Sequence, residues 1–128
     1  MAGGALVLVV EDNEKNMKLF RDVLVAGGYR TLEATTGEEA IEVAAEHSPD
    51  LVLMDIQLPN IDGVEALGRL RLDSRTASVP VLALTAQAME GDRERFLAAG
   101  FDDYLSKPVN VADLVAAVRR YSNVPEAG

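Results

Sequence analysis

Short apolar runs rich in β-branched residues alternate along this 128-residue chain with longer amphipathic segments. The apolar runs cover residues 5–10, 29–34, 51–54, 79–84 and 101–105. Parallel strands need a crossover between neighbours, and an amphipathic helix supplies one. The alternation therefore predicts repeated βα units around a parallel sheet, forming one domain over residues 5–121 and followed by a short flexible tail over residues 122–128.

The amphipathic segments carry helix start and stop signals. Asn13 can cap a first helix that ends at two glycines, and Thr36 with Glu39 three positions later forms a capping box for the second. Asp62 is best interpreted as the cap of a third helix. The fourth is expected over residues 89–99 and the last over residues 111–121. Gly91 either weakens the fourth helix near its start or marks an early boundary of that helix.

About five βα units in sequence, joined by right-handed crossovers, predict a specific fold class. It is an α/β, flavodoxin-like, doubly wound five-stranded parallel sheet of order 2-1-3-4-5 with about five helices. Ligands of such sheets bind at the carboxyl ends of the strands. Functional residues are therefore expected directly after the apolar runs.

Composition excludes several classes of protein. There is no cysteine, so disulfides and thiolate metal sites are excluded. The formal net charge of −9, with scattered basic residues, disfavours direct binding to nucleic acid. No apolar run is long enough to span a bilayer, and the amino terminus lacks the pattern of a signal peptide. A cytoplasmic location without membrane attachment is expected.

Polar residues end four of the five predicted strands. Glu11 and Asp12 follow the first, Asp55 the third, Thr85 the fourth and Lys107 the fifth. Three carboxylates gathered at one sheet edge repel one another, and a hard divalent cation such as Mg²⁺ would relieve the repulsion, with Mn²⁺ also suitable. A lysine ammonium and a hydroxyl beside a carboxylate nucleophile favour a phosphoryl-transfer site.

The motifs VVEDN, LVLMDIQLPNIDG, ALTA and YLSKP make the chain resemble a response-regulator receiver (CheY-like) domain across essentially residues 5–121. Within that family, EDNEKNMKLF and MDIQLPNIDG are most similar to DivK-type single-domain regulators and to receivers of hybrid histidine kinases. The resemblance implies that Asp55 is the phosphoacceptor and Asp12 a direct Mg²⁺ ligand. It also implies that Glu11 acts on the metal through water and that the backbone carbonyl of Gln57 is another ligand.

The remaining motif residues acquire roles by the same resemblance. Lys107 would pair with the phosphoryl group, preceding a cis bond to Pro108, and Thr85 and Tyr104 would form a switch pair. Phosphorylation would then alter the face made by the fourth helix, fifth strand and fifth helix. Side chains at three positions would tune phosphoryl lifetime: Gln57, Ala86 and Gln87.

The resemblance implies a phosphoacceptor signalling domain rather than an enzyme, one that assists its own phosphorylation and dephosphorylation. Its donor would be a phosphohistidine on a histidine kinase or a histidine phosphotransfer protein, and its output would pass to a downstream protein. It would be a monomer or a weak homodimer through the switch face.

Three alternatives remain. The first is a binding module of the same fold that is never phosphorylated, against which the complete acid, threonine and lysine set argues. The second is a flavodoxin-like enzyme or cofactor binder, which the acids after the first strand disfavour because no glycine-rich or Ser/Thr-rich phosphate loop stands there. The third is a receiver excised from a hybrid kinase or longer regulator, which differs in cellular role rather than in chemistry.

Overall fold

A computed structural model of the 128-residue chain describes residues 4–86 and 91–122. Five parallel strands form one sheet in the order β2-β1-β3-β4-β5. They are β1 (Leu6–Val10), β2 (Arg30–Ala34), β3 (Leu51–Asp55), β4 (Val81–Thr85) and β5 (Asp103–Ser106). The helices are α1 (Glu14–Ala26), α2 (Gly37–His47), α3 (Gly63–Leu72), α4 (Asp92–Ala99) and α5 (Val111–Ser122). The predicted doubly wound fold and strand order are confirmed.

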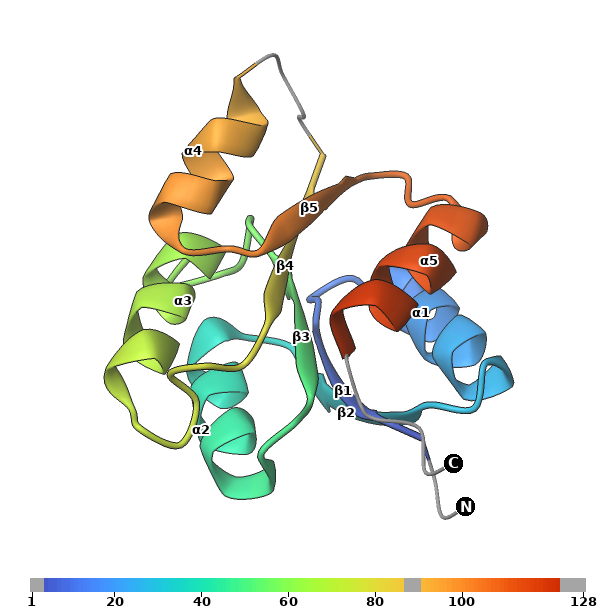
Figure 1. The fold of residues 1–128 in the computed structure, drawn as a ribbon, viewed down its shortest axis with the longest axis horizontal. Coiled ribbons are helices and arrows are strands. Elements are labelled where there is room, and N and C mark those ends of the chain that lie inside the picture. Colours follow the sequence, from blue (N-terminus) through green and yellow to red (C-terminus); the bar gives the residue numbers. More distant parts are fainter. Residues whose placement is uncertain (1–3, 87–90, 123–128) are drawn as a thin grey trace.

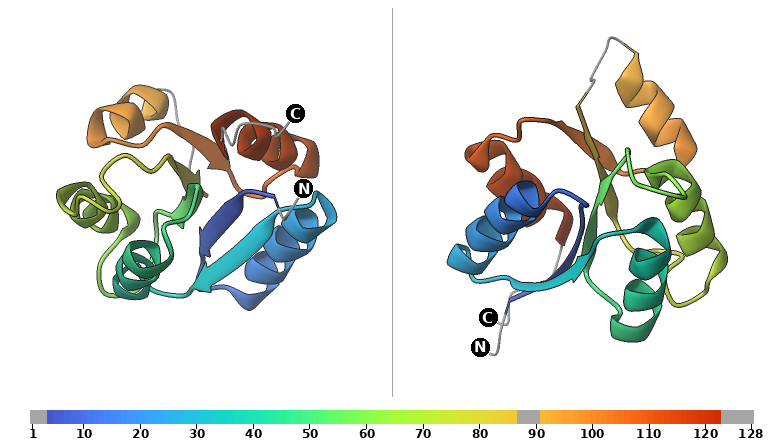
Figure 2. Two further views of the ribbon diagram at one scale, coloured as in Figure 1. Left: turned by 60° about the horizontal axis from the view of Figure 1, so that its bottom comes forward. Right: turned by 180° about the vertical axis from the view of Figure 1, so that it is seen from behind.

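Helices cover both faces of the sheet. α1 and α5 lie on one face, and α2, α3 and α4 lie on the other, as Figure 1 and the two views of Figure 2 show. Successive strand residues alternate between the two layers, as the pleat requires. Val7 and Val9 pack with Phe20 of α1, whereas Leu8 and Val10 pack toward Ala40 of α2.

The central strand β3 is buried at all five positions. That pattern is typical of a parallel strand covered by helices on both faces. Met54 is fully buried as an ordinary core side chain. The strand therefore ends inside the molecule. Its last residue, Asp55, carries a carboxylate, and only 4 % of the residue's surface is exposed.

Helix starts follow the predicted caps. The side chains of Asn13, Thr36 and Asp62 accept hydrogen bonds from backbone amides three residues later. The capping box at α2 differs in one respect, because Glu39 accepts from the amide of Thr35 rather than from that of Thr36. Gly91 is itself the N-cap of α4, with φ 89°, so of the two interpretations the helix boundary is the correct one.

Other boundaries shift by one to three residues from those predicted. β4 begins at Val81 rather than residue 79, because the Val79 amide donates to Thr76 in a turn and Pro80 follows. β5 begins at Asp103 rather than residue 101, because Phe101 completes the C-terminal cap of α4 through its hydrogen bond to Phe96. None of the described helices is long and apolar enough to cross a membrane.

Candidate functional site

Side chains from the carboxyl ends of the strands meet at one edge of the sheet. Glu11 directly follows β1, Asp55 and Thr85 are the last residues of β3 and β4, and Lys107 directly follows β5. All five strands are parallel, so these positions share one edge. The sequence rule for open α/β sheets located this edge correctly.

Lys107 lies between two of the acids. Its Nζ is 2.8 Å from Asp55 Oδ2, to which it donates a hydrogen bond, and also 2.8 Å from Glu11 Oε1. Both carboxylates are almost entirely buried, with side-chain exposures of 1 % for Glu11 and 6 % for Asp55. Buried carboxylates are stable as ions only when they are paired, so the ammonium supports both negative charges.

Glu11, Asp12 and Asp55 form a cluster suited to a cation. A carboxylate oxygen from each lies within 4.8 Å of the others. Glu11 Oε1 is fully buried, and the Lys107 ammonium contacts it at 2.8 Å. Carboxylate oxygens are the ligands that Mg²⁺ prefers, so these residues fit a divalent cation.

The surroundings of this site shift the pKa values of Glu11 and Lys107. Burial raises the pKa of the Glu11 carboxyl above its usual range, and the neighbouring charge of Asp55 adds to this, while Lys107 opposes it. For Lys107, burial lowers the pKa of the ammonium, but its contacts with Asp55 and Glu11 outweigh burial and raise it overall. Lys107 therefore remains a cation at neutral pH.

The loop after β3 orients Asp55. The amide of Gln57 donates to Asp55 Oδ1 at 2.9 Å, so the two carboxylate oxygens have different partners. Gly63 returns the chain to this strand end, because its amide donates to Ile56 O at 2.9 Å. A Cβ on Gly63 would lie 2.5 Å from the backbone oxygen of Asp55, so glycine is required here. The glycine after Asp62 was the sequence signal from which this close approach of the two backbone segments could have been suspected.

Thr85 and Tyr104, the predicted switch pair, lie on adjacent strands. Thr85 is buried, and its carbonyl accepts a hydrogen bond from the amide of Lys107 at 2.7 Å. Tyr104 is half-buried, and its ring packs against Phe96 of α4 with centroids 5.6 Å apart. Backbone bonding thus links the end of β4 to the lysine, while the tyrosine contacts α4.

The other predicted residues have varied positions. Gln57 and Ala86 are both exposed near strand ends, whereas Gln87 lies outside the described residues. The Lys107-Pro108 peptide bond is cis. His47 is exposed in the last turn of α2 and is not part of the carboxylate cluster.

Asp103 is a polar centre that sequence reasoning missed. Its Oδ2 accepts a hydrogen bond from the Tyr121 hydroxyl at 2.9 Å, and its Oδ1 lies 3.3 Å from Arg93 Nη1. One carboxylate thus joins α4, β5 and α5. No sequence motif marks this set, because the three residues meet only once the helices have packed beside β5.

Comparison with known proteins gives a consistent result. Residues 7–119 match the family described as response regulator receiver domain. The chain is 48 % identical over 115 residues to the polar-differentiation response regulator DivK of Brucella ovis, covering 90 % of this chain and 94 % of that protein.

Solved structures of similar proteins agree in fold. The receiver domain of the sensor histidine kinase PA1611 from Pseudomonas aeruginosa, which has a magnesium ion in its active-site cleft, superposes with a TM-score of 0.86 and 38 % identity, covering 94 % of this chain and 99 % of that one. A co-crystal structure of the Saccharomyces cerevisiae phosphotransfer protein Ypd1 with the receiver domain of Ssk1 gives a TM-score of 0.84 and 31 % identity, covering 94 % and 90 %.

Proposed function

The chain belongs to the response regulator receiver domain family, and from that premise we propose that Asp55 accepts a phosphoryl group. The observation that carries this proposal is the 2.8 Å contact of Lys107 Nζ with Asp55 Oδ2 beside two further carboxylates. The Asp55 carboxylate can attack phosphorus as a nucleophile, and the Lys107 ammonium beside it can neutralise the negative charge of the transferred phosphoryl group.

The proposed metal is Mg²⁺, with Mn²⁺ as a substitute. Glu11, Asp12 and Asp55 would hold it, together with the backbone carbonyl of Gln57. When bound, the ion supplies positive charge to the phosphoryl oxygens and relieves repulsion among the carboxylates. The magnesium ion in the PA1611 receiver supports this assignment.

The chain's own residues orient and neutralise the transfer. An Asp55 oxygen forms a bond to the phosphorus of a phosphohistidine, the P–N bond breaks, and the imidazole nitrogen keeps the electron pair. Lys107 pairs with a phosphoryl oxygen, and the Thr85 hydroxyl donates to another. The protein contributes position and charge, while the donor contributes the phosphoryl group. It acts as a phosphoacceptor that assists its own phosphorylation and dephosphorylation rather than as a classical enzyme.

Output is proposed to pass through the face formed by α4, β5 and α5, called here the switch face. Thr85 would move toward the new phosphoryl oxygens, and Tyr104 would change its packing against Phe96, biasing a pre-existing equilibrium. A groove on this face already exists between Arg93, Asp103 and the start of α5. A partner protein, or weakly a second copy of this chain, would bind there.

The proposed donor is a histidine kinase or a histidine phosphotransfer protein, and a downstream protein receives the signal. The Ypd1 complex with the Ssk1 receiver supports a phosphotransfer partner, and similarity to the response regulator DivK supports a signalling role. A cytoplasmic location is part of the same proposal. The receiver unit itself is proposed to span residues 5–121.

The test is small-molecule phosphorylation read by intact mass. Wild-type protein incubated with Mg²⁺ and acetyl phosphate or phosphoramidate should gain one phosphate, and Asp55→Asn should gain none. Asp62→Asn is the matched control, because it alters an acid of the same loop and asparagine still caps α3. A wild type that gains no phosphate from either donor would instead support a binding-only module.

A further inference from the structure

Arg71, in the last turn of α3, reaches across to the end of α4. Its Nη2 donates to the carbonyl of Gly100 at 3.1 Å and lies 3.4 Å from Asp102 Oδ2. Its Nη1 donates to the carbonyls of Ala77 and Val79, which precede β4. One guanidinium therefore joins the end of α3, the approach to β4 and the turn between α4 and β5.

The turn that Arg71 holds is fixed from other sides as well. Gly100 adopts φ 110° as the C-cap of α4, and its amide donates to Leu97. Asp102 exchanges hydrogen bonds with Val81, the first residue of β4, through its amide and its carboxylate. The carboxyl-terminal end of α4 is thus anchored to β4 and α3 together.

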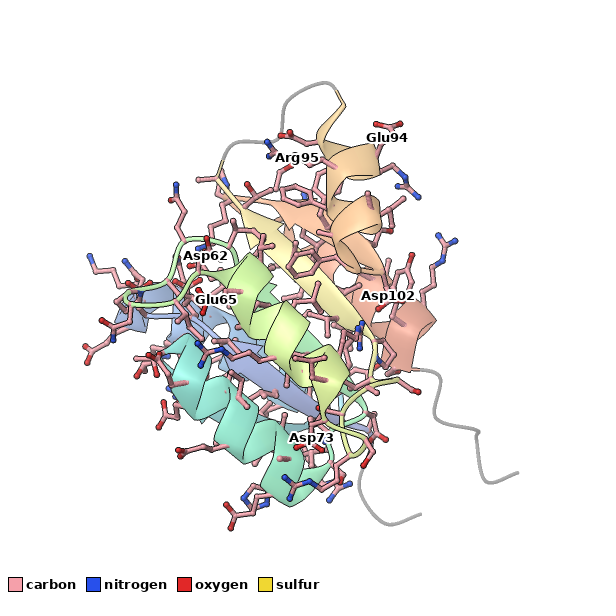
Figure 3. All side chains as sticks on the ribbon, turned by 90° about the vertical axis from the view of Figure 1, so that its left-hand side faces the viewer. Asp62, Glu65, Asp73, Glu94, Arg95 and Asp102 are labelled. Carbon is pink, nitrogen blue, oxygen red and sulfur yellow. The ribbon has the colours of Figure 1, made fainter. Side chains whose placement is uncertain are left out.

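The amino-terminal half of α4 is held differently, because its buried Asp92 pairs with Arg95 of the same helix. Its N-cap, Gly91, has no side chain with which to cap. Arg93 reaches Asp103 at 3.3 Å, but its side chain is 56 % exposed, so the pair contributes little to stability. In Figure 3 Glu94 and Arg95 lie toward the amino-terminal end of α4, whereas Asp102 lies beyond its other end. The helix has only eight residues, so tertiary contacts decide its position.

We propose that Arg71 is a positioning residue that fixes the carboxyl-terminal end of α4 as a pivot and confines rearrangement of the switch face to the amino-terminal half of that helix. This inference rests on the proposed function, because it concerns the response to phosphorylation of Asp55. Phe96 lies between the two halves, buried and in ring contact with both Tyr104 and Phe101. A fixed end lets a movement of Tyr104 tilt the helix through Phe96 rather than displace it as a whole.

The experiment is residue-resolved amide hydrogen exchange with and without beryllofluoride and Mg²⁺, which mimic the phosphoryl group. In wild type, beryllofluoride should change exchange at residues 92–95 and leave the Gly100 and Phe101 amides unchanged. In Arg71→Met, those two amides should exchange at least about tenfold faster even without beryllofluoride, and its effect should extend to them.

Arg69→Met is the matched control, because Arg69 lies on the same helix and forms an ion pair with Glu65 of that helix. It should leave both amides as in wild type. Arg71→Lys keeps the charge but cannot reproduce the fork, so it should give intermediate exchange and covers the case in which Arg71→Met does not fold. All folded variants should accept phosphate at the wild-type rate, since Arg71 is remote from the carboxylate cluster.

Two results would overturn the inference. One is a beryllofluoride effect in wild type that is as large at Gly100 and Phe101 as at residues 92–95. The other is unchanged protection of these amides in both Arg71 variants. If wild type accepts no phosphate on Asp55, the proposed function and the switching part of this inference fail together, whereas exchange of the unphosphorylated proteins still decides whether Arg71 anchors α4.

Discussion

The ammonium of Lys107 lies 2.8 Å from Glu11 Oε1, so the lysine that contacts Asp55 is shared with a second buried acid. The two acids come from different strand ends, 44 residues apart in sequence. In the absence of a metal the lysine is their common counterion. Binding of a cation to the carboxylates would therefore relieve Lys107 of part of this role and leave it available to a phosphoryl oxygen.

Replacing Lys107 with methionine should slow phosphorylation of Asp55 by acetyl phosphate about 100-fold, because one fixed donor to the transferred oxygens is lost. It should also lower thermal stability, since two buried carboxylates lose their counterion. Mg²⁺ should raise the melting temperature of this variant more than that of wild type. Intact-mass time courses and thermal melts measure both effects.

Lys18→Met is the control for that substitution. Lys18 pairs with Asp22 on the exposed side of α1, where the lysine side chain is 68 % exposed. Phosphorylation rate and the Mg²⁺ effect on melting should match those of wild type. Equal phosphorylation rates for Lys107→Met and wild type would contradict the assigned role of Lys107.

The raised pKa of Glu11 predicts how stability varies with pH in the absence of metal. As pH rises above the ordinary carboxyl pKa of 4.5, the unfolded chain releases this proton first, while the folded protein retains it. The folded state then binds more protons, so the contribution of Glu11 to stability falls until its raised pKa is passed.

Glu11→Gln keeps the shape of the side chain and removes its charge. The variant should lose this fall in stability and melt at a higher temperature than wild type at pH 7 without Mg²⁺. Urea unfolding at a series of pH values, each with and without Mg²⁺, measures the difference. A variant that shows the same pH profile as wild type would rule out Glu11 as its source.

Much of the fold and the grouping of the site could be predicted, because helix ends depend on local signals and the site edge depends on strand topology. Asn13, Thr36 and Asp62 cap helices through contacts within three residues, which a sequence displays directly. The site edge follows from topology, since parallel strands bring Asp55 and Lys107 together whatever the details of packing.

The features that could not be predicted depend on contacts between distant segments. Arg71 reads as one more basic residue in the last turn of a helix, and its contact with Gly100 appears only once α3 and α4 cover the same face of the sheet. Asp103 reads as a surface acid, yet three elements determine its partners. The prediction that β5 ends at residue 105 was wrong, because Ser106 also pairs with Thr85 of β4.

Gly63→Ala should destabilise the protein by about 2 kcal/mol, because the new Cβ would overlap backbone atoms at the end of β3 and force the loop to shift. The shift would also move Asp55 away from Lys107 and slow phosphorylation. Gly68→Ala is the control on the same helix: its Cβ would meet nothing within 4 Å, so alanine should stabilise by about 0.5–1 kcal/mol. Urea unfolding and intact-mass phosphorylation compare the two.

Substitution of Gln57 or Gln87 should change the lifetime of the phosphoryl group. Gln57 follows Asp55 by two residues, and its amide bonds to Asp55 Oδ1, so its side chain begins beside the reacting carboxylate. A side chain there can orient or block the water that hydrolyses an acyl phosphate. Gln87, outside the described residues, follows Thr85 by two positions, and Ala86 between them is small enough to leave the phosphoryl pocket open.

The measurement is the decay of phosphorylated protein after removal of the donor, followed by intact mass. Gln57→Ala and Gln87→Ala should each change the decay rate at least severalfold, and Ala86→Val should slow both loading and decay by narrowing access. His47→Ala, which alters an exposed residue of α2 outside the carboxylate cluster, should decay as wild type does. Unchanged decay in both glutamine variants would refute the role given to these side chains and leave access of water to Asp55 governed by the backbone and Lys107.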